Sequence, residues 1–450
     1  MPHHRRRLGG LVWVHILIDK PFRPETRVVK QAGSPPVREH KADICVVGAG
    51  ISGVSAAIEA ARLGKSVILI DGLPALGGQA VNSIIGMIVG LFGNPPGNKQ
   101  LTHGIADDLI RDLGATGDLH LVMGGVSLNA LYNEVALGRW VERKILELKI
   151  TPLLGAVLRR VRAEGHAGRR ISALELATRY GDVVVRANGF VDATGDAAVV
   201  WQAGLECREP AEGLIYGSQM IVIENFDDTK KPSREEMSTR IRERGENYGL
   251  VRRDGFAMSF PGRATAVVNM THIETPLDPL ESSRIGIEGK EQADRTMNFL
   301  RSEFPAAFGQ ARVRAYGLPG IRQTRWIVGR HHLTVDEVRQ GVKFPDSIAR
   351  TAWPLEQHHH AEGYVWEPFD ADHVHYVPLG SMTPSGADNL LAAGRCIDGD
   401  ATALSSVRVM GPCIAMGAAA AHALDLAGTG SVHDIDLAAL RQRLRANIDE

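Results

Sequence analysis

The sequence predicts an α/β protein in which an inserted α+β domain interrupts the main α/β domain. A buried strand, a glycine-rich turn, an alanine-rich helix and a second buried strand follow one another over residues 43–71. Residues 151–195 read as a three-stranded meander, and residues 386–424 as a further buried strand followed by a small-residue helix. We expect this late segment to return to the first domain, because the stretch before it carries strands and helices of its own.

Length, charge and cysteine usage bound the function. At 450 residues the chain is too long for one ordinary core, and its net charge of −1 indicates no general attraction to nucleic acid or anionic membrane. Four cysteines lie far apart, with no C-x-x-C pair: Cys45, Cys207, Cys396 and Cys413. This argues against a disulfide scaffold and a dithiol relay, and it favours a reducing, cytoplasmic location.

The first residues differ from the rest. "MPHHRRRLGGLVWVHILID" has a basic start and an apolar run that is too short to span a bilayer and lacks a small-residue cleavage site. We expect residues 1–41 to be a poorly ordered extension, with the proline-bearing "QAGSPPVREH" as a linker. A twin-arginine export signal is the alternative. No membrane anchor is expected.

The stretch from Cys45 to Asp71 has the pattern of a nucleotide-binding βαβ unit. Gly48, Gly50 and Gly53 stand in G-x-G-x-x-G register between "DICVVGAG" and "SGVSAAIEAARLG". Gly48 permits the tight turn, Gly50 lets a pyrophosphate approach the backbone, and Gly53 lets the helix lie close to the strands. Asp71 ends the second strand, where a carboxylate can accept hydrogen bonds from ribose hydroxyls. Because strand, helix, strand and acid occur in order, we expect a bound dinucleotide.

Later segments narrow the nucleotide. Paired glycines follow Asp71 in "LPALGGQA", a strand ends in the A-T-G-D of "RANGFVDATGDAAVV", and "GADNLLAAGRC" precedes "ALSSVRVMGPCIAMGAAAAHAL". Together these motifs resemble the glutathione-reductase-like flavoproteins and, more narrowly, the FAD-dependent oxidoreductases with an A-T-G-D strand and a late G-R-C…S-V-R-V-M segment. The resemblance runs over most of residues 42–428.

The resemblance implies a Rossmann-like FAD-binding domain of glutathione-reductase type, non-covalent FAD, and a set of cofactor contacts. These are Gly48, Gly50, Gly53, Asp71, Gly77, Gly78, Thr194, Gly195, Asp196, Gly394, Arg395, Asp400 and Met410. The helix from Met410 would point its positive end at the flavin pyrimidine edge, where reduced flavin carries negative charge. The family often has Val-Met-Pro there, whereas this chain has Val409-Met410-Gly411-Pro412.

The segments predict a discontinuous FAD-binding domain at 42–205 and 385–428. Residues 206–384 would form a substrate-capping α+β domain, and 429–450 a C-terminal helix. Within these ranges we expect helical structure over residues 116–150, a helix over 279–304, and a solvated helix or loop over 227–247.

Candidate catalytic groups gather in the capping domain: His358, Arg325, Arg322, His332 and Tyr376. Histidine can take or give a proton near neutrality, and arginine can clamp a carboxylate. His358, Arg322 and Arg325 also occupy positions of the resembled family's motifs. For each residue a structural role is the alternative, such as a solvated histidine or a core tyrosine. The triple histidine 358–360 lacks metal-ligand spacing, so no metal is predicted.

No second G-x-G-x-x-G is present, which argues against a separate NAD(P)H domain, and no flavin–NADPH bridging "DG" segment indicates a group A aromatic monooxygenase. The sequence favours an FAD-dependent oxidoreductase, a dehydrogenase or oxidase that moves a hydride from a small organic substrate to flavin N5. Electrons would leave to oxygen or an external acceptor. A flavin-dependent reductase of an activated double bond and a flavin-bearing electron-relay subunit stay open, as does a homo-oligomer. No nucleic-acid or membrane partner is expected.

Overall fold

The computed structural model describes residues 26–30, 37–124, 127–165, 169–210 and 215–449. Met1–Pro36 and Val37–Glu450 form two separate units. In the first unit, residues 26–30 are exposed and lie outside helices and strands. The basic start and the apolar run discussed above lie within residues 1–25, outside the described residues. All further description concerns the second unit.

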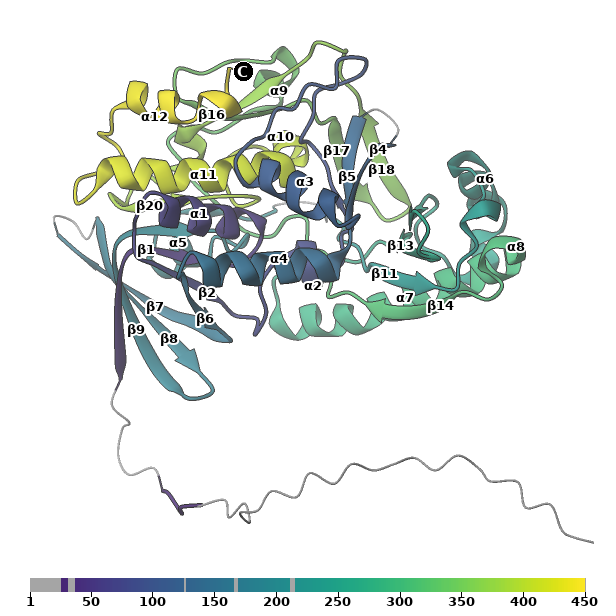
Figure 1. Cartoon of the computed structure of the whole chain (residues 1–450), viewed down its shortest axis with the longest axis horizontal. Helices are drawn as coiled ribbons and strands as arrows, with labels where there is room; N and C mark the ends of the chain where they lie inside the picture. Colours follow the sequence, from purple (N-terminus) through teal and green to yellow (C-terminus); the bar gives the residue numbers. More distant parts are fainter. Residues whose placement is uncertain (1–25, 31–36, 125–126, 166–168, 211–214, 450) are drawn as a thin grey trace, which may run out of the picture. The chain divides into compact units, whose positions relative to one another are not determined.

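A seven-stranded sheet carries the predicted βαβ unit (Figure 1). Its strands run in the order β6 (Thr151–Leu154), β2 (Val67–Asp71), β1 (Arg38–Val47), β9 (Gly181–Asp192), β8 (Arg170–Thr178) and β7 (Ala156–Glu164), with β20 (Leu390–Ala392) also paired to β9. β1 pairs in parallel with both β2 and β9, whereas β7, β8 and β9 form the predicted antiparallel meander. β20 pairs in parallel with Phe190–Asp192, so a late segment adds to the early sheet.

The sheet begins before the predicted domain boundary at residue 42. Arg38–Lys41 already belongs to β1, where it pairs with Val183–Arg186 of β9. The end of the predicted linker is therefore strand, because β9 offers free backbone groups beyond the buried part of β1.

Two helices pack closely at the centre of the fold, α1 (Ile51–Arg62) and α11 (Met410–Ala427) (Figure 1). A Cβ added to Gly417 of α11 would lie 2.1 Å from the carbonyl oxygen of Ser52, so only glycine permits this approach. By length and composition α11 could cross a membrane, but 72% of its apolar window is buried inside the protein, as in a core helix.

The middle of the chain forms separate small sheets. Strands β12 (Phe256–Phe260), β13 (Thr265–Asn269), β11 (Ile221–Glu224) and β14 (Arg312–Tyr316) make an antiparallel sheet, packed against α7 (Pro279–Glu303) around a second hydrophobic core. The two-stranded sheets are β10–β15 (Cys207–Arg208, Trp326–Ile327), β16–β19 (Ser347–Thr351, His375–Pro378) and β17–β18 (Leu355–His360, Gly363–Glu367).

The prediction of helical structure over residues 116–150 is partly wrong. Leu119–Gly124 forms strand β4 and Ser127–Tyr132 forms strand β5, which pairs with β4 and with β3 (Met87–Ile88). Among the described residues of this stretch, α4 (Glu134–Glu147) is the helical part. Asn133 ends β5 and caps α4 by accepting hydrogen bonds from Val135 and Ala136. β5 pairs with β3 on one side and with β4 on the other, and this pairing outweighs the local helical pattern.

The remaining helices lie around these sheets. They are α2 (Gly78–Asn82), α3 (Ile105–Ala115), α5 (Ala198–Gln202), α6 (Arg234–Arg244), α8 (Pro305–Phe308), α9 (Val335–Gln340), α10 (Ala401–Val407) and α12 (Leu437–Arg443), with 3-10 turns at Asp228–Lys230, Gly245–Tyr248, Leu379–Met382 and Arg445–Asn447. α7 lies within the stretch predicted to be helical, α6 lies within the stretch predicted to be a solvated helix or loop, and α12 takes up part of the predicted C-terminal helix. α6 is largely exposed, as its charge pattern predicts.

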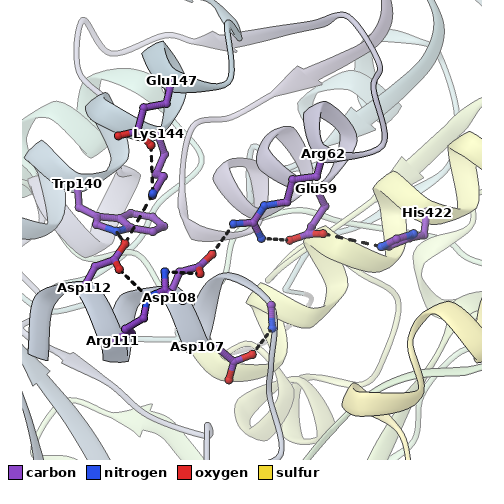
Figure 2. A network of polar contacts seen from close by, with 11 residues as sticks. Glu59, Arg62, Asp107, Asp108, Arg111, Asp112, Trp140, Lys144, Glu147 and His422 are labelled. Carbon is purple, nitrogen blue, oxygen red and sulfur yellow. Dashed lines mark hydrogen bonds and ion pairs between the residues drawn. The ribbon is translucent and has the colours of Figure 1, made fainter.

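A polar network joins α1, α3, α4 and α11 on one side of the fold (Figure 2). Arg62 of α1 pairs with Glu59 and with Asp108 of α3, and Asp112 accepts a hydrogen bond from the Trp140 indole of α4 at 2.9 Å. His422 of α11 lies 3.9 Å from Glu59. The network links these helices to one another at the C-terminal end of α1.

Candidate active site

A cavity of about 1300 Å³ runs from the glycine turn into the middle of the chain. It exceeds the roughly 300–1,000 Å³ of a typical single-ligand pocket. Ten of the predicted cofactor contacts line it: Gly48, Gly50, Asp71, Gly78, Thr194, Gly195, Asp196, Gly394, Arg395 and Met410. The fold therefore brings the early, middle and late motifs to one space, with room left beyond them.

The glycine turn has the shape that the motif predicts. Gly48 has φ +100°, and a Cβ there would lie 2.3 Å from the carbonyl oxygen of Ala193. A Cβ on Gly53 would lie 1.8 Å from the carbonyl oxygen of Gly48, whereas one on Gly50 would meet nothing within 4 Å. Gly50 thus borders open space, while Gly53 lies behind the turn and outside the cavity lining. The cradle fits a pyrophosphate at the N-terminus of α1.

Asp71 stabilises this turn as well as bordering the cavity. Its Oδ2 accepts a hydrogen bond from the Ala49 amide at 2.6 Å, and its Oδ1 accepts one from the Leu73 amide at 2.8 Å. Each carboxylate oxygen retains a lone pair for a ribose hydroxyl. The acid at the end of β2 therefore holds the loop that approaches the phosphates.

Two of the predicted cofactor contacts have other partners. Asp400 caps α10 by accepting from the Ala403 amide at 2.7 Å, and it also accepts from the Val335 amide at 2.6 Å. Gly77 adopts the left-handed conformation before α2, where its amide donates to the Ala49 carbonyl. Neither residue lines the cavity, so both position neighbouring segments.

The A-T-G-D segment is held by a carboxylate that the sequence pattern did not single out. Asp192 is fully buried and accepts hydrogen bonds from Thr194 and from the amides of Val199 and Val200. Burial raises its pKa above the usual value, and these hydrogen bonds oppose the rise. Asp192 therefore fixes the loop that places Thr194, Gly195 and Asp196 at the cavity.

The late segment closes the same cavity. Arg395 donates to Asp196 at 2.7 Å and to Thr324 at 3.0 Å, which links the G-R-C turn to the A-T-G-D loop. The N-terminus of α11 opens into the cavity at Met410 and has no side-chain cap. Its positive end can thus stabilise negative charge on a bound group, despite the shifted proline.

The predicted catalytic residues are not brought together. Arg322 lines the cavity, whereas Arg325, His332 and Tyr376 lie outside its lining. Arg325 pairs with Glu209 and stacks over Trp201, and His332 contacts Asp398 at 2.7 Å. These partners give Arg325 and His332 structural roles at β10 and β15.

His358 does not line the cavity but contacts Glu356, a cavity-lining carboxylate that the sequence analysis did not single out. Glu356 lines the cavity, and its Oε1 lies 3.1 Å from Nε2 of His358, while its Oε2 accepts from the Trp353 indole at 3.2 Å. Strand alternation is the signal that could have found Glu356, because positions 356 and 358 share one face of β17.

A second histidine extends this contact. Nδ1 of His358 lies 3.0 Å from Nε2 of His272, whose Nδ1 lies 2.9 Å from the carbonyl oxygen of Ala361. We refer to Glu356, His358 and His272 as the proton array. A carbonyl only accepts, so Nδ1 of His272 must donate to it. With Glu356 as a carboxylate and both imidazoles neutral, Nδ1 of His358 and Nε2 of His272 both lack a proton, so no hydrogen bond forms between them. One additional proton on the proton array allows all three hydrogen bonds to form together.

The surroundings oppose that additional proton. Burial and the charge of Arg322 lower the pKa of His358 to about 3, and burial with the charges of Arg252 and Arg322 lowers that of His272 to about 2. Burial disfavours the Glu356 carboxylate, but the hydrogen bond and charge of His358 and the charges of Arg322 and Arg408 outweigh it and lower its pKa to about 2. At neutral pH the proton array therefore lacks one hydrogen bond and gains it on taking up a proton.

Further cavity residues come from segments far apart in the sequence. Arg408, Tyr364 and Trp366 line it together with Trp353 and Glu356. Among the described residues, no group of three or more His, Cys, Asp or Glu side chains could hold a metal ion.

Comparison with known proteins identifies the family. The model of the FAD dependent oxidoreductases matches residues 43–444. No curated protein matches the chain.

Solved structures with a similar fold are distant in sequence. A geranylgeranyl bacteriochlorophyll reductase-like protein from Thermoplasma acidophilum is 14% identical, with a TM-score of 0.46, and the match covers 86% of this chain and 78% of that chain. The flavin-dependent brominase Bmp2 is 13% identical, with a TM-score of 0.45, and the match covers 90% of this chain and 83% of that chain. PqsL from P. aeruginosa is 16% identical, with a TM-score of 0.41, and the match covers 91% of this chain and 93% of that chain.

The family match spans nearly all of the second unit and includes every motif that lines the cavity. The glycine cradle and the two helix N-termini fit the dinucleotide that this family uses. The chain therefore belongs to the FAD-dependent oxidoreductases, enzymes that bind FAD.

Proposed function

We propose that the protein oxidises a small organic substrate by hydride transfer to N5 of non-covalently bound FAD, as a dehydrogenase or oxidase. One observation carries the proposal: a single cavity joins the glycine cradle to the interior charges of Arg322 and Glu356. The FAD domain would be of glutathione-reductase type, and oxygen or an external acceptor would take the electrons. A cytoplasmic location and the domain boundaries given above stay predictions.

Bound FAD supplies the acceptor for a hydride and its two electrons. The substrate loses that hydride from a C–H bond, a C=O or C=N bond forms, and one proton leaves the adjacent oxygen or nitrogen. We propose Glu356 as the group that accepts this proton. His358 and His272 act behind it as positioning residues, since a proton passed to the array completes its third hydrogen bond.

The proposal differs from the sequence-based one in the atom that meets the substrate. His358 is 1% exposed and does not line the cavity, whereas the Glu356 carboxylate does. The histidine predicted as the base would therefore act through Glu356. Its contact with the glutamate combines a base and the group that orients it, an arrangement suited to general base catalysis.

Anaerobic mixing tests the direction of the reaction. The protein is purified, loaded with FAD, and mixed without oxygen with a panel of alcohols, amines and hydroxy acids. Bleaching of the flavin absorbance by one class would support the proposal. Failure to bind FAD, or no bleaching together with reoxidation of pre-reduced protein by an activated alkene, would overturn it.

The reductase of an activated double bond is the second candidate. Burial and the charge of Arg408 lower the pKa of Arg322, a cavity-lining arginine, to about 9. A guanidinium with a lowered pKa is a better proton donor to a developing carbanion. The reoxidation arm of the experiment would select this alternative.

A further inference from the structure

Two interior arginines of the cavity have only neutral partners. Arg322 donates to the Tyr216 carbonyl at 2.6 Å and to the Ser218 hydroxyl at 3.0 Å. Within the described part of the chain, Arg408 donates to the Glu356 carbonyl, at 3.4 Å. Among the described residues, no carboxylate oxygen lies within 4.0 Å of either guanidinium, although both line the cavity.

Two other enclosed arginines, Arg252 and Arg395, pair with carboxylates. Arg252, 1% exposed, forms an ion pair with Asp254, and Arg395 pairs with Asp196 at 2.7 Å. A guanidinium has five N–H donors, and both arginines are half-buried at the cavity, so a ligand that displaces the remaining water without supplying an anion would be costly. The donors that Arg322 and Arg408 leave unused therefore favour an anion supplied from outside the chain.

The charge balance of this part of the cavity points the same way. Arg408 lowers the pKa of Arg322, and Glu356 is the carboxylate that opposes this effect most strongly. Both oxygens of Glu356 already contact Trp353 and His358. Two guanidinium groups against one carboxylate leave one positive charge in excess, which a monoanion would neutralise.

An aromatic wall lies beside these charges. Trp353, Tyr364 and Trp366 all line the cavity, and the Trp366 ring centroid lies 5.4 Å from that of Trp353 and 6.0 Å from that of Tyr364, edge to face. Rings set edge to face offer both a ring face and a ring edge to a bound aromatic group, which gains burial and ring contacts. Few precisely placed polar groups within an apolar lining are typical of small-molecule sites.

We propose that the substrate is an aromatic monocarboxylate whose carboxylate accepts hydrogen bonds from Arg322 and Arg408 and whose ring lies against Trp353, Tyr364 and Trp366. This rests on the proposed function, because FAD occupies the remainder of the cavity. Arginine suits the role, since its planar fork can bind carboxylate oxygens in pairs. A carboxylate bound there also offsets the positive charge around Glu356, which favours proton uptake by the proton array.

Benzoate and benzamide test the proposal on the full-length, FAD-loaded protein. They share a ring and differ in charge. Binding is followed by the change in flavin visible absorbance and, independently, by calorimetry. We expect benzoate to bind at least about tenfold more tightly than benzamide, and Arg408→Gln and Arg322→Gln each to weaken benzoate binding by about tenfold or more.

Matched measurements separate the possible failures. Arg284→Gln, a change on the exposed face of α7, should leave benzoate affinity unchanged. FAD affinity is measured for every variant. Equal binding of benzamide by the wild-type protein, equally tight competition by inorganic phosphate, or an Arg408→Gln variant that loses FAD but keeps benzoate affinity would each overturn the aromatic carboxylate.

The wild-type comparison decides even if both arginine variants fail to fold. A wild-type protein that does not bind FAD would instead refute the proposed function, and that result is distinct from weak benzoate binding to a loaded protein.

Discussion

Nε2 of His272 lies 3.0 Å from Nδ1 of His358, and each of the two imidazoles is 1% exposed. The residues come from segments 86 positions apart in the sequence, and Glu356 at the cavity wall continues the contact. One proton decides whether all hydrogen bonds of this array can form. The first two predictions follow from this property.

Glu356→Gln should lower kcat by about 100-fold or more and leave KM nearly unchanged. The amide has nearly the shape of the carboxylate, but it cannot accept a proton near neutral pH, and general base catalysis typically contributes 10²–10⁴-fold. Steady-state kinetics on a substrate found by the anaerobic screen measures both constants. His358→Gln should lower kcat, whereas His359→Gln, on the opposite face of β17, should not. A change confined to KM in Glu356→Gln would contradict the role of proton acceptor.

The pH dependence of kcat/KM should show no acid limb between pH 5 and 7. A base must be unprotonated to act, and the pKa of Glu356 is lowered to about 2, with those of His358 and His272 to about 3 and about 2. Burial and the charges of Arg322, Arg408 and Arg252 lower the pKa values of the two histidines, and the charges of Arg322 and Arg408 also lower that of Glu356. A limb near pH 6.5 in an otherwise stable protein would indicate an exposed histidine base instead.

Gly50→Ala should weaken FAD binding by about tenfold or more without unfolding the protein. The added methyl group meets no protein atom within 4 Å, but it enters the space where a pyrophosphate approaches the backbone. FAD titration followed by fluorescence measures the affinity, and thermal unfolding of the apoprotein measures the fold. Gly114→Ala, also without a neighbour within 4 Å but remote from the cavity lining, is the control. Equal FAD affinity for Gly50→Ala and the wild type would argue against this cradle.

Asp192→Asn should lower the free energy of unfolding by about 1–3 kcal/mol. The amide nitrogen would face donors that now meet a carboxylate oxygen, which leaves buried groups unsatisfied. Because the same carboxylate holds Thr194, FAD affinity should fall as well. Denaturant unfolding measures the first effect. Asp182→Asn on the same strand, about half exposed and paired with Arg159, should cost less than about 1 kcal/mol.

Stability should fall as the pH drops from 6.5 towards 4, and His375 should contribute to the slope. Burial and the charge of His373 lower the pKa of His375 to about 3, so the unfolded chain binds a proton in this window that the folded protein does not. The contribution is at most about 1.4 kcal/mol per pH unit. His375→Gln should reduce the pH slope of denaturant unfolding, whereas His40→Gln on exposed β1 should not. An unchanged slope in His375→Gln would show that His375 is not a source of the acid sensitivity.

The βαβ unit, the meander and the small-residue helix could be predicted from the sequence. In each of these, the spacing of apolar residues and the glycines act between neighbouring segments of the chain, so the pattern can be read locally. Gly48, Gly50 and Asp71 could be assigned to the dinucleotide for the same reason. The cofactor followed from the order of such motifs along the chain.

Which side chains line the cavity depends on long-range packing and could not be predicted from the sequence. Glu356, Arg322 and Arg408 meet at one cavity because strand β17, the loop before β15 and the turn between α10 and α11 converge there, and no local pattern encodes that convergence. The helical prediction for β4 and β5 is wrong for a related reason. These strands are stabilised by pairing with each other and by the pairing of β5 with β3. Pairing with the distant β3 thus favours a strand at residues where the local periodicity alone predicts a helix.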